Sequence, residues 1–387
     1  MLKHPFSVAI LGAGHGGLAL AGYLARRGHR VALWNRSQKR IAPVAELGGI
    51  RLTAPGSGTI FAPVAMATCD LAAALSDVRR ILVAVPASGH ADVARRCAPH
   101  LRDGQVVLLL PGRTGGALEF RRVLRQAGCG ARVLLGEANT FPFAARSTEA
   151  SALIYGTKAE VLAAALPATR TPELLDACRP LLPMLSPAYS VLHTGLTNLG
   201  AILHPVITLL TAERIRRGDA FDFYTEGVTP SVASTLADAD AERLRVARAY
   251  GVAVCSLRVW IASAYGHHGD TLLTAVGGNP AYVGIKAPTS LEHRYLLEDV
   301  PTGLIPLLEL GRAAGLALPT LRALVERGRA ARGGEGWQSP RTLEALGIKG
   351  LGAEGIRIAV ERGLAPVTPL APLPSRIAPR FELVPQV

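Results

Sequence analysis

Short apolar runs alternate with amphipathic stretches along the first third of the chain. The runs at residues 7–11, 30–34, 80–86, 105–111 and 132–137 are mainly apolar and rich in leucine and valine. Continuous runs of this kind are typical of strands buried on both faces of a parallel sheet. Between them, segments such as LALAGYLARRG and SGHADVARRCAPHL place apolar residues at helical intervals. The alternation predicts an α/β fold with a doubly wound parallel sheet.

The pattern changes in the second half of the chain. A long amphipathic stretch from Gly195 to Asp219 opens a region in which helical periodicity dominates. We therefore expect an α/β domain over residues 1–188 and an all-helical domain over residues 189–363. Residues 364–387 are rich in proline and lack a core-forming pattern, which predicts a loosely ordered tail.

Three glycines, Gly12, Gly14 and Gly17, follow the first apolar run with the spacing G-x-G-x-x-G. In this motif the glycines permit a tight turn, a close approach of pyrophosphate and close packing of helix on strand. The free N–H groups around His15 would bind phosphate oxygens at the helix N-terminus. Pro86 ends a strand at the same edge of the sheet and is expected on the cofactor side. The motif predicts dinucleotide binding, with an ordinary strand-to-helix turn as the alternative.

The end of the second strand distinguishes the two nicotinamide cofactors. An acidic residue there binds the ribose 2′-hydroxyl of NAD, whereas an arginine accommodates the 2′-phosphate of NADP. This chain has Asn35 and Arg36, then Lys39 and Arg40, with no carboxylate before Glu46. We therefore expect NADP(H) to be preferred over NAD(H), with Arg36 as the main phosphate contact and Asn35 beside it. The alternative is a group of solvated basic residues on a surface loop.

The chain is strongly basic, with a formal net charge of +13 over 387 residues. Aromatic residues make up only 5% and do not alternate with basic runs, so the sequence does not indicate a stacking platform for nucleic acid. The charge is better explained by attraction of anionic small molecules. Because no apolar run approaches the roughly 18–20 residues that cross a bilayer, we expect no membrane association.

The five cysteines are scattered along the chain and form no CxxC pair or His/Cys cluster with metal-ligand spacing. We expect them to be small buried residues in a reducing cytoplasm, and we expect no metal site.

Histidine is the commonest general acid–base because its ordinary pKa lies near neutral pH. Among ten histidines, His204 lies in an otherwise apolar helical stretch, ILHPVITLL, whereas His90 is expected at a surface turn or helix end. Asn198 precedes His204 by nearly two helical turns, so both side chains could face one cleft. The alternative for His204 is a core histidine whose hydrogen bonds are satisfied.

The segment EHRYLLEDVPTGL, residues 292–304, places charged residues beside apolar ones. Arg294 could bind a substrate carboxylate through two hydrogen bonds, and Asp299 could orient a histidine. The alternative is structural, with an ion pair from Arg294 to Glu298 and Asp299 as a helix cap. The residue pattern leaves both interpretations open.

Six stretches taken together resemble the octopine/nopaline-type opine dehydrogenases. In chain order they are GAGHGG, VPASGH, PGRTGGALEF, ANTFPFAAR, NLGAILHP, and HRYLLEDVP followed by TGL. The resemblance extends to about Gly363 and implies a Rossmann domain followed by an all-helical domain, with the active site between them. It also implies that an amino acid is condensed with a 2-oxo acid and the imine is reduced with NAD(P)H.

The resemblance further implies roles for individual residues. His204 would be the acid–base and Asp299 its partner, while Arg294 would bind a substrate carboxylate and Asn198 would be a polar contact in the cleft. The small-molecule partners would be the amino acid and the 2-oxo acid, and a homodimer is reasonable for the family.

Two other functions remain open at this point. A reductase similar to ketopantoate reductase or glycerol-3-phosphate dehydrogenase would typically use a lysine as catalytic acid. Lys158, Lys286 and Lys349 are the only lysines beyond the cofactor motif, and none has a convincing context. A non-catalytic NADPH-binding sensor would bind the cofactor without turnover and would lack contact between His204 and Asp299.

Overall fold

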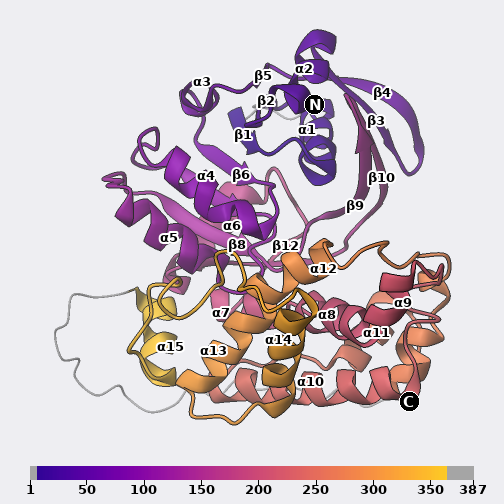
Figure 1. Ribbon diagram of the computed structural model, residues 1–387. Helices are drawn as coiled ribbons and strands as arrows, with labels where there is room; N and C mark the ends of the chain where they lie inside the picture. The colour runs from indigo at the N-terminus through magenta and orange to yellow at the C-terminus, as the bar shows by residue number, and fades with distance from the viewer. Residues whose placement is uncertain (1–6, 364–387) are drawn as a thin grey trace, which may run out of the picture.

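The computed structural model describes residues 7–363, and the upper half in Figure 1 is built on an eight-stranded sheet. Its strand order is β12-β11-β8-β7-β6-β1-β2-β5. The strands are β1 (Ser7–Leu11), β2 (Arg30–Trp34), β5 (Met66–Thr68), β6 (Arg80–Val83), β7 (Val106–Leu109), β8 (Leu134–Ala138), β11 (Val161–Leu166) and β12 (Leu185–Pro187). All neighbours pair in parallel except β11 with β8. The predicted parallel sheet is confirmed.

The order of the strands reverses at β1, which pairs with β2 on one side and β6 on the other. Such a reversal is where doubly wound sheets bind their ligands, beyond the carboxyl ends of the strands. The loops that follow β1, β6 and β7 all leave the sheet at this edge.

Helices cover both faces of the sheet. The sheet separates two apolar cores, one on each face. Helices α1 (His15–Arg26), α2 (Gln38–Leu47) and α6 (Thr171–Cys178) contribute to one core. The second core contains residues of α3 (Leu71–Leu75), α4 (His90–Cys97) and α5 (Gly116–Gln126). This second core continues into the helical half of the molecule, which gives the two halves a shared apolar contact.

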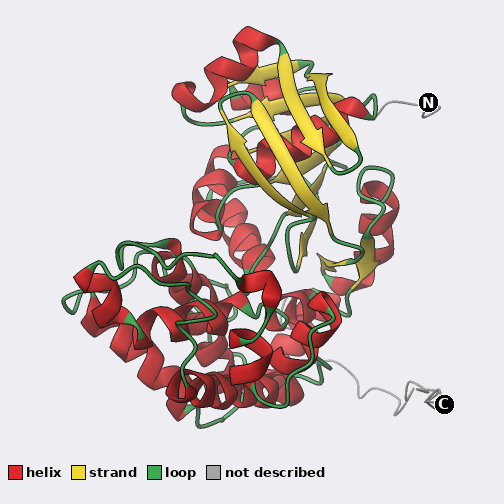
Figure 2. Cartoon of the chain, turned by 90° about the vertical axis from the view of Figure 1, so that its right-hand side faces the viewer, coloured by secondary structure: helices red, strands yellow, loops and turns green. Residues whose placement is uncertain are grey.

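A second sheet, with the order β4-β3-β10-β9, packs against α1 and is visible in Figure 2. Its strands are β3 (Gly49–Ala54), β4 (Ser57–Pro63), β9 (Phe143–Thr148) and β10 (Ser151–Thr157). Ser151 pairs with Arg51 in the parallel contact between β10 and β3. The sheet is not predicted from the sequence, because its two pairs of consecutive strands, β3 with β4 and β9 with β10, are separated by most of the α/β domain.

The lower half in Figure 1 contains helices, joined by loops and short 3-10 or π turns. The predicted stretch from Gly195 to Asp219 is divided twice, at residues 197–199 and at Thr211. The α-helices are α7 (Val191–Leu196), α8 (Gly200–Leu210), α9 (Ala212–Arg217), α10 (Pro230–Ala249), α11 (Leu257–Tyr265), α12 (Arg294–Leu297), α13 (Ile305–Ala313) and α14 (Pro319–Ala331). Figure 2 shows the difference in secondary structure between the two halves, with the large group of strands in one half and helices in the other.

The chain after α14 returns to the α/β half. Arg341 is fully buried and bonds to loops of the large sheet, and α15 (Ala353–Arg362) packs near α7 and the 3-10 turn η2 (Ala168–Arg170). The helical domain expected to end at residue 363 therefore sends its last segment back across the junction. The expected tail, 364–387, lies outside the described residues.

Within residues 7–363, no helix has both the length and the apolar character required to span a membrane. The cysteines differ in burial, since Cys97 and Cys178 are buried but Cys255 is exposed. The expectation of uniformly buried cysteines is therefore wrong for Cys255, whose loop before α11 lies at the surface.

Candidate active site

The glycine loop after β1 has the shape that a dinucleotide pyrophosphate requires. Gly12 has a φ of +119°, and a Cβ there would lie 2.6 Å from the carbonyl oxygen of Ala84. A Cβ on Gly17 would lie 1.8 Å from the carbonyl oxygen of Gly12, so α1 packs closely on its strand. Gly14 faces open space, and α1 begins at His15 with no side-chain cap and no acid in its first turn. These residues fit a bound dinucleotide.

The end of β2 contacts this loop through Asn35, whose Oδ1 accepts a hydrogen bond from the backbone N–H of Ala13 at 3.2 Å. Arg36 is exposed, and its Nη1 lies 3.4 Å from Oδ2 of Asp92. The sequence analysis found no carboxylate before Glu46 and missed Asp92, which α4 brings close from far along the chain. Arg36 consequently has an acidic neighbour that competes with a ligand phosphate.

Two further predicted cofactor residues lie at the same edge. Pro86 begins the turn from β6 into the 3-10 helix η1 (Ala87–Gly89). The ring of His15 turns toward β9, where its Nδ1 accepts the backbone N–H of Ser147 at 2.9 Å. Burial, with nearby Arg146 and Arg40, lowers the pKa of His15 and so disfavours its charged form.

The closest contact in the predicted active site joins His204 to Asp299. His204 projects from α8, and its Nδ1 lies 2.8 Å from Oδ2 of Asp299, which directly precedes the π-helical turn η5 (Val300–Leu304). The ring of Tyr295 stacks on His204 with centroids 4.3 Å apart. Asp299 makes no side-chain cap bond to η5, so the capping alternative does not describe it. The structure brings together two residues separated by 95 positions.

A third residue, Arg113, completes this group and is absent from the sequence-based set. Its Nη2 lies 3.7 Å from Oδ1 of Asp299, and its Nη1 donates to Oδ1 of Asn198 at 3.1 Å. Asp299 is 1% exposed, and its Oδ1 has no hydrogen-bond partner. Burial alone would raise the pKa of Asp299, but Arg113 and His204 together hold it below the ordinary value. The motif PGRTGG was noted in the sequence, yet its arginine was not assigned a role.

Arg294 forms an ion pair with Glu298, as the structural interpretation of this segment predicts. Its Nη2 lies 3.0 Å from Oε2 of Glu298, and the Arg294 side chain is 56% exposed. The other oxygen of Glu298 lies 3.7 Å from Nε of Arg113 and accepts the backbone N–H of Ala87 at 3.2 Å. The exposed guanidinium remains accessible to a ligand at the rim of the site.

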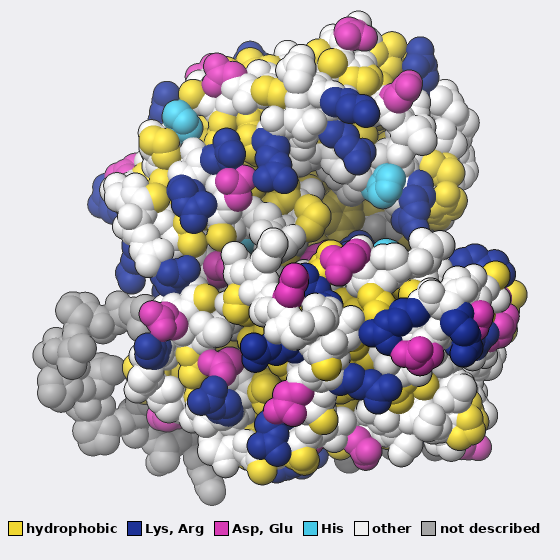
Figure 3. Space-filling model, viewed as in Figure 1, with side chains coloured by type: hydrophobic (Ala, Val, Ile, Leu, Met, Phe, Trp, Pro, Cys, Tyr) yellow, Lys and Arg dark blue, Asp and Glu magenta, His cyan; other side chains and the backbone are white. Residues whose placement is uncertain are grey.

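These residues gather at the junction of the two halves, where Figure 3 shows the surface hollowed. The glycine loop belongs to the upper half, whereas His204 and Asp299 belong to the lower half. One expectation about the surroundings is wrong: His90 is fully buried, because the returning chain covers the N-terminus of α4 and places Arg341 2.9 Å from its Nδ1.

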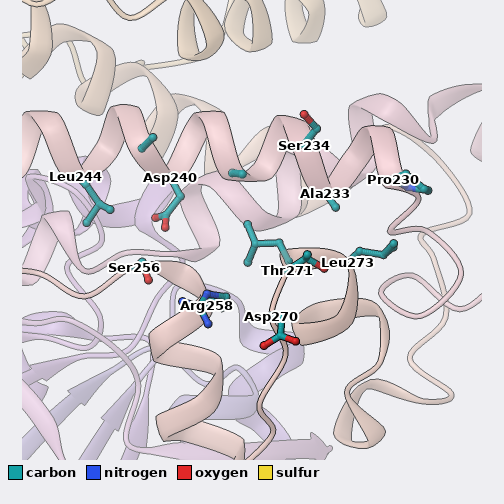
Figure 4. A pocket seen from close by; sticks show the side chains of 13 residues that line it. Pro230, Ala233, Ser234, Asp240, Leu244, Ser256, Arg258, Asp270, Thr271 and Leu273 are labelled. Atoms are coloured by element: carbon teal, nitrogen blue, oxygen red, sulfur yellow. The ribbon is translucent and has the colours of Figure 1, made fainter.

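One pocket in the described chain lies away from the predicted site residues. It has a volume of about 550 Å³ and lies between α10 and the loop after α11, as Figure 4 shows. Its lining includes Ala233, Leu244, Arg258 and Asp270 but none of the predicted site residues. This pocket therefore does not coincide with the predicted site.

Comparisons with known proteins identify the family. Residues 187–332 match the family described as NAD/NADP octopine/nopaline dehydrogenase, alpha-helical domain. Residues 7–112 match the N-terminus of NAD-dependent glycerol-3-phosphate dehydrogenase. An opine dehydrogenase of Arthrobacter sp. (strain 1C) is 41% identical over 355 residues, which cover 91% of this chain and 98% of that protein.

Solved structures show the same fold. An octopine dehydrogenase complex with NADH and L-arginine has a TM-score of 0.78 at 21% identity and covers 94% of this chain and 99% of its own. A yersinopine dehydrogenase with bound NADP⁺ has a TM-score of 0.69 at 20% identity, over 93% of this chain and 98% of its own. At these identities the structures compare folds only.

Proposed function

The chain belongs to the octopine/nopaline-type opine dehydrogenase family, and from its own site we propose which residues perform the reaction and which cofactor is preferred. As an opine dehydrogenase it is an NAD(P)-dependent oxidoreductase that acts on CH–NH bonds. In the synthetic direction an amino acid condenses with a 2-oxo acid, and in reverse the product is oxidised. The observation that carries the assignment of residues is the 2.8 Å contact between His204 and Asp299 at the junction of the two halves.

His204 is the general acid–base of this proposal. Its Nδ1 is held by Asp299, which leaves Nε2 for proton transfer with the substrate. Nε2 takes a proton from the α-ammonium group, and the resulting amine adds to the carbonyl carbon of the oxo acid. A proton moves from nitrogen to oxygen in the adduct and gives the carbinolamine. Nε2 then returns its proton to the carbinolamine hydroxyl, which leaves as water and gives the protonated imine. Buried Asp299 stabilises the imidazolium between these two steps.

Two arginines bind the carboxylates that both substrates carry. Arg113 lies beside Asp299 and is the inner cation, while Arg294 is the outer, exposed one. A guanidinium forms paired hydrogen bonds with a carboxylate and so fixes its orientation. Asn198 is the polar contact of this proposal. Its amide oxygen accepts a bond from Arg113, and its amide nitrogen donates to the hydroxyl of Thr114. When bound, the reduced dinucleotide supplies the hydride that the oriented imine carbon accepts.

We propose that NADP(H) is preferred over NAD(H). The support is Arg36 at the end of β2, exposed and followed by Lys39 and Arg40. Its partner Asp92 also binds Arg96 at 3.0 Å, so a 2′-phosphate can replace Asp92 without leaving that acid unpaired. Surface ion pairs of this kind contribute only about 0–1 kcal/mol to stability, so replacing Asp92 by the phosphate costs little free energy.

The experiment that tests the proposal follows oxidation of NADPH and NADH by the purified protein against a matrix of amino acids and 2-oxo acids. We expect turnover only when both substrate classes are present, with NADPH giving the higher kcat/KM. Mass spectrometry should then show a product formed from both substrates with loss of water and addition of two hydrogens. Turnover with an oxo acid alone would contradict reductive condensation and indicate a simple reductase. Binding of NADPH without turnover in the whole matrix would favour the sensor.

A further inference from the structure

Arg341 contacts the loop that follows β6 and the loop that follows β7, although it lies far from both in sequence. It is fully buried, and its Nη1 donates to the carbonyl oxygens of Gly112 at 2.9 Å and Thr114 at 3.1 Å. Its Nη2 donates to the carbonyl oxygen of Ala87 at 3.3 Å. We propose that Arg341 is a positioning residue that holds Arg113 in the active site. The inference rests on the proposed role of Arg113.

The backbone of Arg113 explains why its loop needs such support. Arg113 has a φ of +60°, in the left-handed region that non-glycine residues seldom occupy. The two carbonyl groups that flank it, of Gly112 and Thr114, both turn toward the single guanidinium of Arg341. Without that guanidinium, two buried acceptors lose a partner and the loop can relax to a more common conformation. Relaxation would move the Arg113 side chain away from Asp299.

The backbone around Arg341 is tied to the same site. Its N–H donates to the carbonyl oxygen of Pro301 at 2.9 Å, two residues beyond Asp299. The N–H of Thr114 donates to the carbonyl oxygen of Thr302 at 3.3 Å. The returning chain therefore lies behind both parts of the site, the arginine loop and the segment that carries Asp299. This arrangement fixes one relative to the other.

A purely structural role would rest on the ion pair with Glu119, whose Oε2 lies 3.0 Å from Nε of Arg341. That pair alone does not require the contacts to the two loops. Only one of the acceptors around the guanidinium is a carboxylate; three are loop carbonyls and one is the Nδ1 of His90. Burial and the charge of Arg341 hold the pKa of His90 well below its ordinary value, so its ring accepts this bond in the neutral form.

The test replaces Arg341 by lysine, which keeps the charge but cannot reach both loops with a planar fork of donors. We expect Arg341→Lys to lower kcat by about 10- to 100-fold, as displacement of a binding group does, while the Kd for NADPH changes by less than about threefold. The acid limb of the pH profile of kcat/KM should move to higher pH, because Asp299 loses the nearby charge of Arg113. Hydrogen exchange should accelerate at the amides of residues 112–116.

Arg243 provides the matched control. It is also buried and bonds to Asp240 and to the carbonyl oxygens of Leu196 and Cys255, but to none of the loop carbonyls that Arg341 contacts. Arg243→Lys should lower thermal stability but leave the pH profile and the exchange of residues 112–116 unchanged. If Arg341→Lys behaves in the same way as Arg243→Lys, the proposal is overturned.

A second variant decides the matter if Arg341→Lys does not fold. Glu119→Gln keeps the guanidinium but weakens the contact that orients it, and we expect the same shift of the acid limb with a loss in kcat of about three- to tenfold. An unchanged profile in Glu119→Gln would contradict the proposal. Wild-type protein that turns over substrates establishes the opine dehydrogenase reaction independently. Absence of wild-type turnover would refute that reaction, whereas the exchange of residues 112–116 still tests Arg341.

Discussion

The two ends of the site differ in how the chain builds them. The cofactor end is formed by β1, the glycine loop, α1 and β2, which are consecutive in sequence. The proposed substrate end contains Arg113, His204 and Asp299, which come from three distant segments and meet around the carboxylate of Asp299. A local motif can be recognised from spacing alone, whereas a site of distant residues depends on the packing of the whole molecule. The predictions below test whether the two ends are also separable in function.

The largest expected effect is at the substrate end. His204→Ala removes the nitrogen proposed to transfer the proton, and kcat should fall by about 10²–10⁴-fold, the usual contribution of a general acid–base. The Kd for NADPH should stay close to that of the wild type, because no atom of the glycine loop changes. Steady-state kinetics and fluorescence titration with NADPH measure the two quantities.

His267→Ala is the matched control for this variant. His267 lies in an exposed loop, where its Nε2 is 3.0 Å from the carbonyl oxygen of Thr274. It should retain wild-type kcat. Near-normal turnover in His204→Ala would remove His204 from the mechanism, and a large loss of NADPH affinity would show that the two ends are not separable.

The next effect concerns Arg113. Its replacement by methionine keeps much of the side-chain volume but removes the charge beside Asp299, so kcat/KM should fall by about 10- to 100-fold through loss of a charge-assisted contact. The folded pKa of Asp299 is depressed, so the ionised carboxylate is lost as pH falls through that pKa. Without Arg113 the pKa rises, and activity should begin to decline at a higher pH. A pH profile of kcat/KM checks the direction of this shift. An unshifted acid limb would contradict the effect of Arg113 on Asp299.

The same comparison explains what sequence reasoning could reach. The strands, the glycine loop and the helical second half follow from local periodicity, and the structure confirms the α/β fold with a helical domain. His204 and Asp299 were named from a residue pattern and a family resemblance, and only the folded chain shows their contact. Arg113 lies in the motif PGRTGG, but the motif does not indicate what its arginine contacts, and Arg341 has no local signal. Their importance depends on a left-handed backbone and on a C-terminal segment that crosses back to the sheet.

At the cofactor end we expect a smaller and selective effect. Arg36→Ala should weaken NADPH binding by about 10- to 100-fold, the value of a hydrogen bond between charged groups, and NADH binding by less than about threefold. Asp92→Asn should shift NADPH binding in the opposite direction by less than about fivefold, because it removes a competing surface partner. Arg30→Ala, at the opposite end of β2, is the control. Equal weakening of both cofactors in Arg36→Ala would refute the assignment to the 2′-phosphate.

The smallest effect on turnover is expected at Glu137, a fully buried residue at the end of β8. Burial raises its pKa to about 7, against the hydrogen bonds from Thr194 and Ala117 that favour the ionised form. The hydroxyl of Thr194 lies 2.6 Å from Oε1 and 3.0 Å from the carbonyl oxygen of Val191. One hydroxyl hydrogen cannot serve both oxygens, so a protonated Glu137 that donates to Thr194 satisfies all three groups.

This arrangement predicts the sign of a pH effect on stability. The folded pKa of Glu137 lies above the unfolded value, so its contribution to stability is fully present below about pH 4.5 and is lost as pH rises through about 7. Glu137→Gln presents an amide donor to Thr194 and an oxygen to the N–H of Ala117 at every pH. The free energy of unfolding should therefore decline between pH 5 and pH 8 by about 1–3 kcal/mol more in the wild type than in the variant. Urea unfolding at both pH values measures the difference, and parallel declines would show that Glu137 is ionised throughout. Glu137 borders the loop of Gly112 but touches neither His204 nor the glycine motif. The change in the free energy of unfolding therefore concerns the structure that joins the two ends of the site.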